Sequence, residues 1–177
     1  MHTAEAQLGR FFLEMWGQRT PRMSFDKFVR HVTPLMSKDL FNADLLEPYI
    51  RFDSQNYTRN VICQTPQFAL LVLCWKLQQF SSIHDHASSV SAVYVHQGKM
   101  TSREFASMPN SPVVLEKEEL IQDGEFVMAD DNIVHQLGNA NDSNLVTVHI
   151  YSPPLTIINK YDINTPEVSV LDLQQSV

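Results

Sequence analysis

The sequence predicts a mainly β protein in which α-helices precede an antiparallel β-barrel or sandwich. Up to about residue 50, apolar residues recur at spacings of three and four, which is typical of amphipathic helices. From about residue 56, at least seven short segments are rich in β-branched and aromatic residues, and Gly, Pro, Asn or Asp separates most of them. Helices followed by closely spaced strands favour helices packed on an antiparallel β structure.

Three helices are expected in the N-terminal segment of about 4–50. The first, over 4–18, places its apolar residues at Leu8, Phe11, Phe12 and Met15. The second, over 24–36, begins after Ser24, because a serine before an acidic first turn is typical of a helix start. A third short helix is expected over 37–50 and ends near Pro48.

The strands are expected in a barrel that occupies about 56–165. Their segments are 57–64, 67–77, 90–98, 100–106, 113–121, 125–130 and 144–152. After Tyr161 we expect one final strand and a loose end. No repeat or low-complexity linker divides the sequence, so we expect residues 1–177 to form a single domain.

Composition restricts the classes of function. Hydrophobic residues make up 44% of the chain, which is enough for a core, and the net charge of −7 gives no basic surface for nucleic acid or anionic membranes. No apolar run approaches the roughly 18 residues of a membrane span, and residues 1–19 lack the pattern of a signal peptide. Cys63 and Cys74 have neither zinc-site nor CxxC spacing, so no disulfide is expected. We expect a cytoplasmic monomer.

The stretch SSIHDHASSVSAVYVHQG, residues 81–98, holds the most informative of the seven histidines. On a strand, His84 and His86 project to the same side while Asp85 points away, so two imidazoles converge. His96 lies ten residues beyond His86, on the order of 30 Å along an extended strand, and is discounted as a ligand. His2 and His31 are assigned no functional role.

Two segments resemble the sequence motifs of the cupin superfamily. Residues 84–98 fit H-x-H, four residues, an acidic position, six residues and glycine, except that Ser91 replaces the acidic ligand. Residues 124–139 fit the second motif at Gly124, His135 and Asn139. The resemblance implies a jelly-roll-like barrel in which His84, His86 and His135 form a metal site. Without a carboxylate this ligand set is neutral, suits iron, zinc, copper or nickel, and favours anionic ligands such as a thiolate.

The segment NLVTVHIYSPPL, residues 144–155, places Thr147, His149 and Tyr151 on one face of a strand. The pattern alone favours a strand with a solvated side. Together with YTRN at 57–60, LCW at 73–75 and SSIHDH at 81–86, however, HIYSPP at 149–154 is similar to the cysteine dioxygenase family. The resemblance extends in unbroken order from about Arg51 to Asp162.

This resemblance implies a mononuclear non-haem Fe(II) enzyme that uses both atoms of O2 to oxidise a small thiol to a sulfinate. It implies that Arg59, with Tyr57 nearby, binds the substrate carboxylate. It also implies that Tyr151 directs its hydroxyl at the substrate and dioxygen, that His149 holds this hydroxyl, and that Thr147 steadies His149. Trp75 and Cys74 are expected only to pack the barrel, and Ser152-Pro153 is expected to be a cis peptide.

Two positions bear on how far the resemblance extends. Animal members carry a cysteine where this chain has Ser91, and that cysteine cross-links to the tyrosine matching Tyr151; serine cannot do so, and we predict activity without the cross-link. Arg59 favours L-cysteine over 3-mercaptopropionate, because enzymes for the latter tend to have glutamine there. Oxidation of 3-mercaptopropionate or another small thiol remains the alternative.

Other classes also stay open. A metal-binding cupin that senses or stores a ligand without turnover would keep the three histidines, but has no need of Arg59, Tyr57 or the Tyr151 face. A three-histidine zinc hydrolase would fit the same ligands. A purely structural barrel would bind no metal stoichiometrically.

Overall fold

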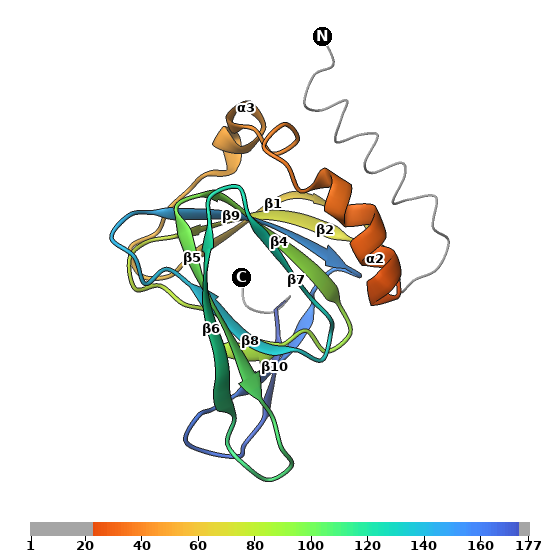
Figure 1. The fold of residues 1–177 in the computed structure, drawn as a ribbon, viewed down its shortest axis with the longest axis vertical. Coiled ribbons are helices and arrows are strands. Elements are labelled where there is room, and N and C mark those ends of the chain that lie inside the picture. The colour runs from red at the N-terminus through yellow and green to blue at the C-terminus, as the bar shows by residue number, and fades with distance from the viewer. Residues whose placement is uncertain (1–22, 174–177) are drawn as a thin grey trace.

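The structure is a computed structural model that describes residues 23–173. Short helices precede the strands in the chain and lie beside the sheets (Figure 1). They are α2 (Phe25–Val32), the 3-10 helix η1 (Thr33–Leu35), α3 (Ala43–Leu46) and the 3-10 helix η2 (Glu47–Tyr49). The expected helix over 4–18 lies outside the described residues.

The helix predicted over 24–36 is confirmed, as α2 continued by η1, although the Ser24 side chain makes no capping hydrogen bond. The helix predicted over 37–50 is wrong in extent, since only the residues of α3 are α-helical. Asn42 starts α3 by accepting a hydrogen bond from Leu45 N at 3.1 Å. Pro48 has no N–H to continue an α-helix, and η2 takes over at that point.

Eleven strands in the described residues form two antiparallel sheets. The five-stranded sheet has the order β1-β2-β9-β4-β7 and the six-stranded sheet the order β11-β10-β3-β8-β5-β6. The strands of the first sheet are β1 (Thr58–Gln64), β2 (Ala69–Trp75), β9 (Leu145–Ser152), β4 (Val90–Gln97) and β7 (Phe126–Ala129). Those of the second are β11 (Ser169–Asp172), β10 (Ile157–Tyr161), β3 (Ile83–Asp85), β8 (Val134–Gly138), β5 (Lys99–Ala106) and β6 (Val114–Gln122).

Two hydrophobic clusters lie on opposite faces of the five-stranded sheet. Phe28, Val32 and Leu46 from the helices pack on one face, against residues that include Val72 and Val148. The other face points into the barrel, toward residues of the six-stranded sheet. The central strands β2 and β9 are consequently buried along their whole length. This explains the continuous apolar sequence of β2, ALLVLCW.

The mainly β fold with preceding helices is confirmed, and each of the seven predicted segments contains a strand. The strand expected after Tyr161 is β11. Sequence patterns do not single out β3, β8 or β10, because these strands are short and interrupted by polar residues. Two of them carry the histidines of interest.

Two further expectations are met. Ser152-Pro153 is a cis peptide, and Cys63 and Cys74 are free thiols. Within residues 23–173, none of the helices has the length and apolar character needed to span a membrane.

Candidate metal centre and substrate pocket

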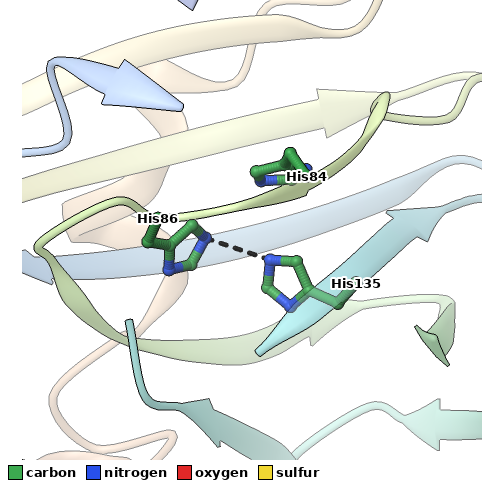
Figure 2. Close-up of side chains that lie close together, drawn as sticks. All are labelled: His84, His86 and His135. Carbon is green, nitrogen blue, oxygen red and sulfur yellow. Dashed lines mark hydrogen bonds between the residues drawn. The ribbon is translucent and has the colours of Figure 1, made fainter. Parts of the chain in front are cut away.

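His84, His86 and His135 come together inside the barrel (Figure 2). His84 lies in β3 and pairs across the strands with His135 in β8, while His86 directly follows β3. One ring nitrogen from each residue lies within 4.8 Å of the others, and all three side chains are buried. Asp85 points to the other side, where it accepts hydrogen bonds from Tyr161 Oη at 2.6 Å and Asn159 Nδ2 at 3.0 Å.

The chemical state of these imidazoles fits a divalent metal. Burial lowers the pKa of His84 and holds the pKa values of His86 and His135 well below their ordinary value. The Nε2 atoms of His86 and His135 are 3.0 Å apart, and His86 Nδ1 is buried without a hydrogen-bond partner among the described residues. Neutral imidazole nitrogens that converge in a buried place are suitable ligands for iron, zinc, copper or nickel.

His84 has one ring nitrogen occupied by the protein. Its Nδ1 lies 2.8 Å from the carbonyl oxygen of Ser82, and a carbonyl can only accept, so Nδ1 carries the proton. The lone pair of Nε2 is therefore available to a metal. Such a hydrogen bond on the outer nitrogen is common for histidines that bind metals.

Ser91 occupies the place expected for a carboxylate ligand. It pairs directly with Tyr151 across β4 and β9, and its hydroxyl is buried without a partner among the described residues. The candidate ligand group contains three histidines and no carboxylate. Its neutral character, expected from the sequence, is retained in the structure.

A chain of hydrogen bonds runs beside the histidines. Trp75 Nε1 lies 2.9 Å from Thr147 Oγ1, which lies 2.8 Å from His149 Nε2. His149 Nδ1 lies 2.9 Å from Tyr151 Oη. All four side chains are buried, so the face that carries Thr147, His149 and Tyr151 is not a solvated one.

Burial sets the ionisation of this chain. It holds the pKa of His149 well below its ordinary value, and the positive charge of Arg59 acts in the same direction. Burial also raises the pKa of Tyr151 to about 12, although Arg59 opposes the shift. His149 is therefore neutral and Tyr151 protonated near pH 7.

Tyr57 and Arg59 also line the pocket. The Tyr57 ring stacks on Trp75 with centroids 4.1 Å apart, and the Arg59 guanidinium lies 6.0 Å from the centroid of the Tyr151 ring. Arg59 is exposed on β1, a strand at the edge of its sheet. The pocket is small, about 20 Å³. Seven of the eight site residues predicted from the sequence line it, and the eighth, Thr147, contacts the lining residue His149.

Sequence reasoning missed the polar role of Trp75, which was expected only to pack the barrel. Its N–H reaches a residue 72 positions away in the chain, and no local pattern signals that contact. The sequence correctly predicted that Asp85 points away from the histidines. It did not predict the hydrogen-bond partners of Asp85 on β10. These partners tie β3, the short strand that carries His84, to β10.

Comparison with solved structures defines the fold class. A protein from Thermus thermophilus superposes with a TM-score of 0.54 at 17% identity, over 62% of this chain and 94% of that one. A Klebsiella pneumoniae protein described as having a double-stranded β-helix domain gives a TM-score of 0.51 at 17% identity, over 61% and 81%. This chain accordingly has a double-stranded β-helix fold.

Sequence comparison defines the family within that class. The sequence model of the cysteine dioxygenase type I family matches residues 24–164, and the chain belongs to this family. Cysteine dioxygenase type 1 from Homo sapiens is 31% identical over 122 residues, which are 66% of this chain and 61% of the human protein. The Danio rerio protein is 28% identical over 144 residues, which are 77% and 71%. The match thus spans about three fifths of the human relative.

Proposed function

We propose that this protein is a non-haem iron thiol dioxygenase that oxidises L-cysteine with O2 to cysteine sulfinate. The observation that carries the proposal is that a three-histidine group, a buried tyrosine hydroxyl and an arginine border one small pocket. Membership of the cysteine dioxygenase family supports it. We take the active form to be a cytoplasmic monomer of one domain.

His84, His86 and His135 would hold the metal. A ferrous ion bound there would supply coordination of the thiol and of dioxygen, together with the redox chemistry of oxygen transfer. The residues of the chain supply binding, orientation and the placement of protons. In the balanced reaction both oxygen atoms of O2 reach the substrate sulfur, and no further reductant is consumed.

Arg59 and Tyr57 would bind the carboxylate of the substrate. A guanidinium forms paired hydrogen bonds with a carboxylate, and Arg59 lines the pocket while its residue stays exposed to solvent. The Tyr57 ring is held by its stacking on Trp75, so its position is fixed before substrate arrives. The small volume of the pocket favours a small thiol.

Tyr151 would donate a hydrogen bond to the reacting groups. An indole N–H can only donate, so Thr147 accepts from Trp75 and can give its own hydrogen to His149 Nε2. His149 then carries its proton on Nδ1 and donates it to the Tyr151 oxygen. The hydrogen of the Tyr151 hydroxyl is left free to point into the pocket.

The test is oxygen uptake by the Fe(II)-loaded protein with cysteine, 3-mercaptopropionate and cysteamine in separate reactions, with mass detection of sulfinate. We expect cysteine sulfinate as the dominant product, with one O2 consumed for each thiol. Dominant oxidation of 3-mercaptopropionate, which carries the same carboxylate, would retain the chemistry and overturn the preference for cysteine. Absence of uptake with every thiol, despite bound iron, would contradict the proposal and favour a cupin that senses or stores a ligand.

Arg59→Ala tests the carboxylate site separately. We expect the KM for cysteine to rise about 100-fold, since a charged hydrogen-bonded pair is lost, while kcat and iron content change little. Arg59→Lys keeps the charge without the paired geometry and should lie between the two. An unchanged KM would exclude Arg59 from substrate binding.

A further inference from the structure

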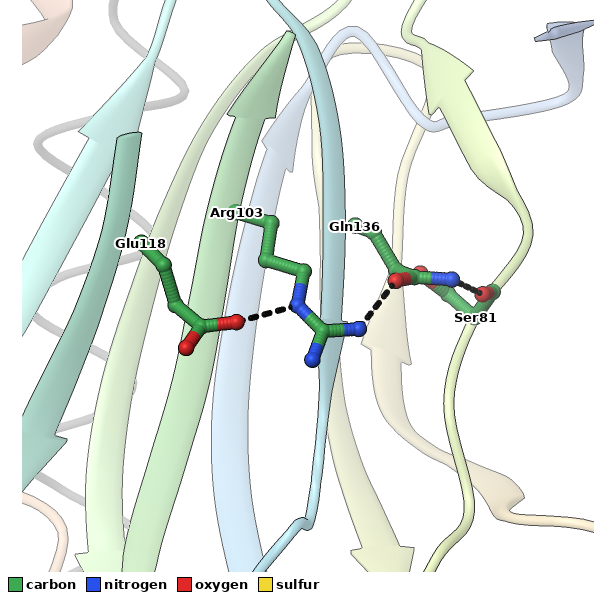
Figure 3. A network of polar contacts seen from close by, with 4 residues as sticks. All are labelled: Ser81, Arg103, Glu118 and Gln136. Atoms are coloured by element: carbon green, nitrogen blue, oxygen red, sulfur yellow. Dashed lines mark hydrogen bonds and ion pairs between the residues drawn. The ribbon is translucent and has the colours of Figure 1, made fainter. Parts of the chain in front are cut away.

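A row of polar side chains crosses three strands of the six-stranded sheet and ends at Ser81 (Figure 3). Glu118 on β6 pairs with Arg103 on β5, and Arg103 pairs with Gln136 on β8. Arg103 Nε lies 2.5 Å from Glu118 Oε2, and Arg103 Nη1 lies 3.0 Å from Gln136 Oε1. Gln136 Nε2 lies 3.0 Å from the carbonyl oxygen of Ser81.

Gln136 is the link in this row, because its two ends face partners of opposite kind. Arginine can only donate and a carbonyl can only accept, so the amide orientation is fixed, with Oε1 toward Arg103 and Nε2 toward Ser81. A carboxylate in place of the amide could accept from Arg103 but could not donate to Ser81.

The row ends on the segment that supports His84. Ser81 is tied to β8 by hydrogen bonds from Ser81 N to Leu137 O at 2.8 Å and from Leu137 N to Ser81 Oγ at 3.1 Å. The neighbouring carbonyl, that of Ser82, accepts from His84 Nδ1. Gln136 itself directly follows His135. The row therefore joins the two segments that carry His84 and His135.

The Arg103 guanidinium has a second contact with the same segment. It lies 5.0 Å from the centroid of the Phe80 ring, within the range of a cation–π interaction. Phe80 forms an isolated bridge with Gly138 at the end of β8. Arg103 consequently contacts the Phe80 ring directly and the Ser81 carbonyl indirectly, through Gln136.

We infer that Arg103 and Gln136 are positioning residues for the metal site, which fix the spacing of His84 and His135 and the direction of His84 Nε2. The inference rests on the proposed metal site. Neither residue belongs to the candidate ligand group. Residues that orient metal ligands typically contribute about 10- to 100-fold to metal affinity.

The decisive variant is Gln136→Glu, because positioning and simple electrostatics predict opposite signs. An added carboxylate near a cation site should strengthen metal binding if only charge mattered. If the Ser81 contact positions His84, the same change should weaken binding. Glu118→Gln is the matched control, since it removes a charge from the outer end of the row and leaves the Arg103, Gln136 and Ser81 contacts in place.

The experiment titrates the metal-free full chain with Co²⁺, against a competing chelator and by visible absorption, and records the thermal midpoint of each metal-free variant. We expect Gln136→Glu and Gln136→Leu to weaken Co²⁺ binding at least 10-fold, and Glu118→Gln to stay within about twofold. At the other positioning residue, Arg103→Lys should weaken Co²⁺ binding less than Arg103→Ala does.

The outcomes separate this inference from the proposed metal site. Suppose that the wild-type protein binds one Co²⁺ and that folded Gln136 variants bind it with the same affinity. This result would overturn the positioning role and leave the metal site standing. Tighter binding by Gln136→Glu would overturn it as well. Absence of stoichiometric binding by the wild-type protein would overturn the metal site, and the inference with it.

Discussion

At the scale of single residues, the pocket is organised by which side chains can donate and which can accept. Trp75 has one polar hydrogen and no acceptor, so it donates to Thr147, and the hydrogen bonds continue through His149 to Tyr151. Burial keeps Tyr151 protonated, with its pKa raised to about 12. The hydroxyl can therefore serve as a hydrogen-bond donor throughout the physiological pH range.

Tyr151→Phe removes that hydroxyl and keeps the ring. We expect kcat for cysteine oxidation to fall about 100-fold, the usual effect of losing one oriented donor, with little change in KM or iron content. Oxygen-uptake kinetics and metal analysis measure these quantities. Tyr94→Phe is the matched control, because Tyr94 is buried in the helix-side cluster and its hydroxyl has no partner among the described residues. Equal activity of the two variants would rule out the donor role of Tyr151.

The sequence predicted which residues border the pocket better than how they are held. Spacing places His84 and His86 on one side, and period two places Thr147, His149 and Tyr151 on one face. The resemblance to a family supplied His135, Arg59 and Tyr57. The contacts of Trp75 with Thr147, of Asp85 with Tyr161 and of Gln136 with Ser81 join residues far apart in the chain, and no local pattern encodes them.

At the scale of elements, the short strands β3 and β8 matter more than their length suggests. They carry His84 and His135 in direct register, and β3 contains only three residues. Strands of this length have no clear hydrophobic alternation, so the sequence did not predict them. Long strands were predicted because their sequences carry a clear pattern: β2 is one apolar run, whereas β9 alternates apolar residues with Thr147, His149 and Tyr151.

Gly138→Ala tests how tightly β8 is held against the segment before β3. A Cβ at this position would lie 2.2 Å from Phe80 Cδ1 and 2.7 Å from the Gln79 carbonyl oxygen. We expect the free energy of unfolding to fall by about 1–3 kcal/mol, the usual cost of overpacking, as measured by urea denaturation. Phe80→Leu in the same chain should restore part of the loss, since the carbonyl contact would remain. Unchanged stability would show that this contact is not tight.

At the scale of the whole molecule, the barrel places polar chemistry within an apolar interior. The five-stranded sheet is covered by helices on one face and lines the pocket with the other. Helices followed by antiparallel strands were predictable from composition and periodicity. The order of the strands in the two sheets was not, because it depends on pairings between distant segments.

The buried histidines make the stability of the metal-free protein depend on pH. The fold keeps His149 neutral, with a pKa well below its ordinary value because of burial, and the candidate ligands share this direction. The unfolded chain gains protons on these histidines near pH 6.5. Below that pH the unfolded state binds more protons, so stability is present above pH 6.5 and is lost as pH falls.

Urea unfolding of the metal-free protein at pH 7.5 and pH 5.5 tests this dependence. We expect a lower free energy of unfolding at pH 5.5, with each buried histidine contributing up to about 1.4 kcal/mol per pH unit below its unfolded pKa. His149→Gln should reduce the slope, because one titrating group is removed. Equal or greater stability at pH 5.5 would contradict the neutral state of the buried histidines.

The central claim, that His84, His86 and His135 hold the catalytic iron, is tested most directly by anomalous diffraction at the iron edge from crystals of the Fe(II)-loaded protein. We expect one strong peak inside the barrel, about 2.1 Å from one ring nitrogen of each histidine. A peak elsewhere, or an empty three-histidine group at saturating iron, would contradict the claim.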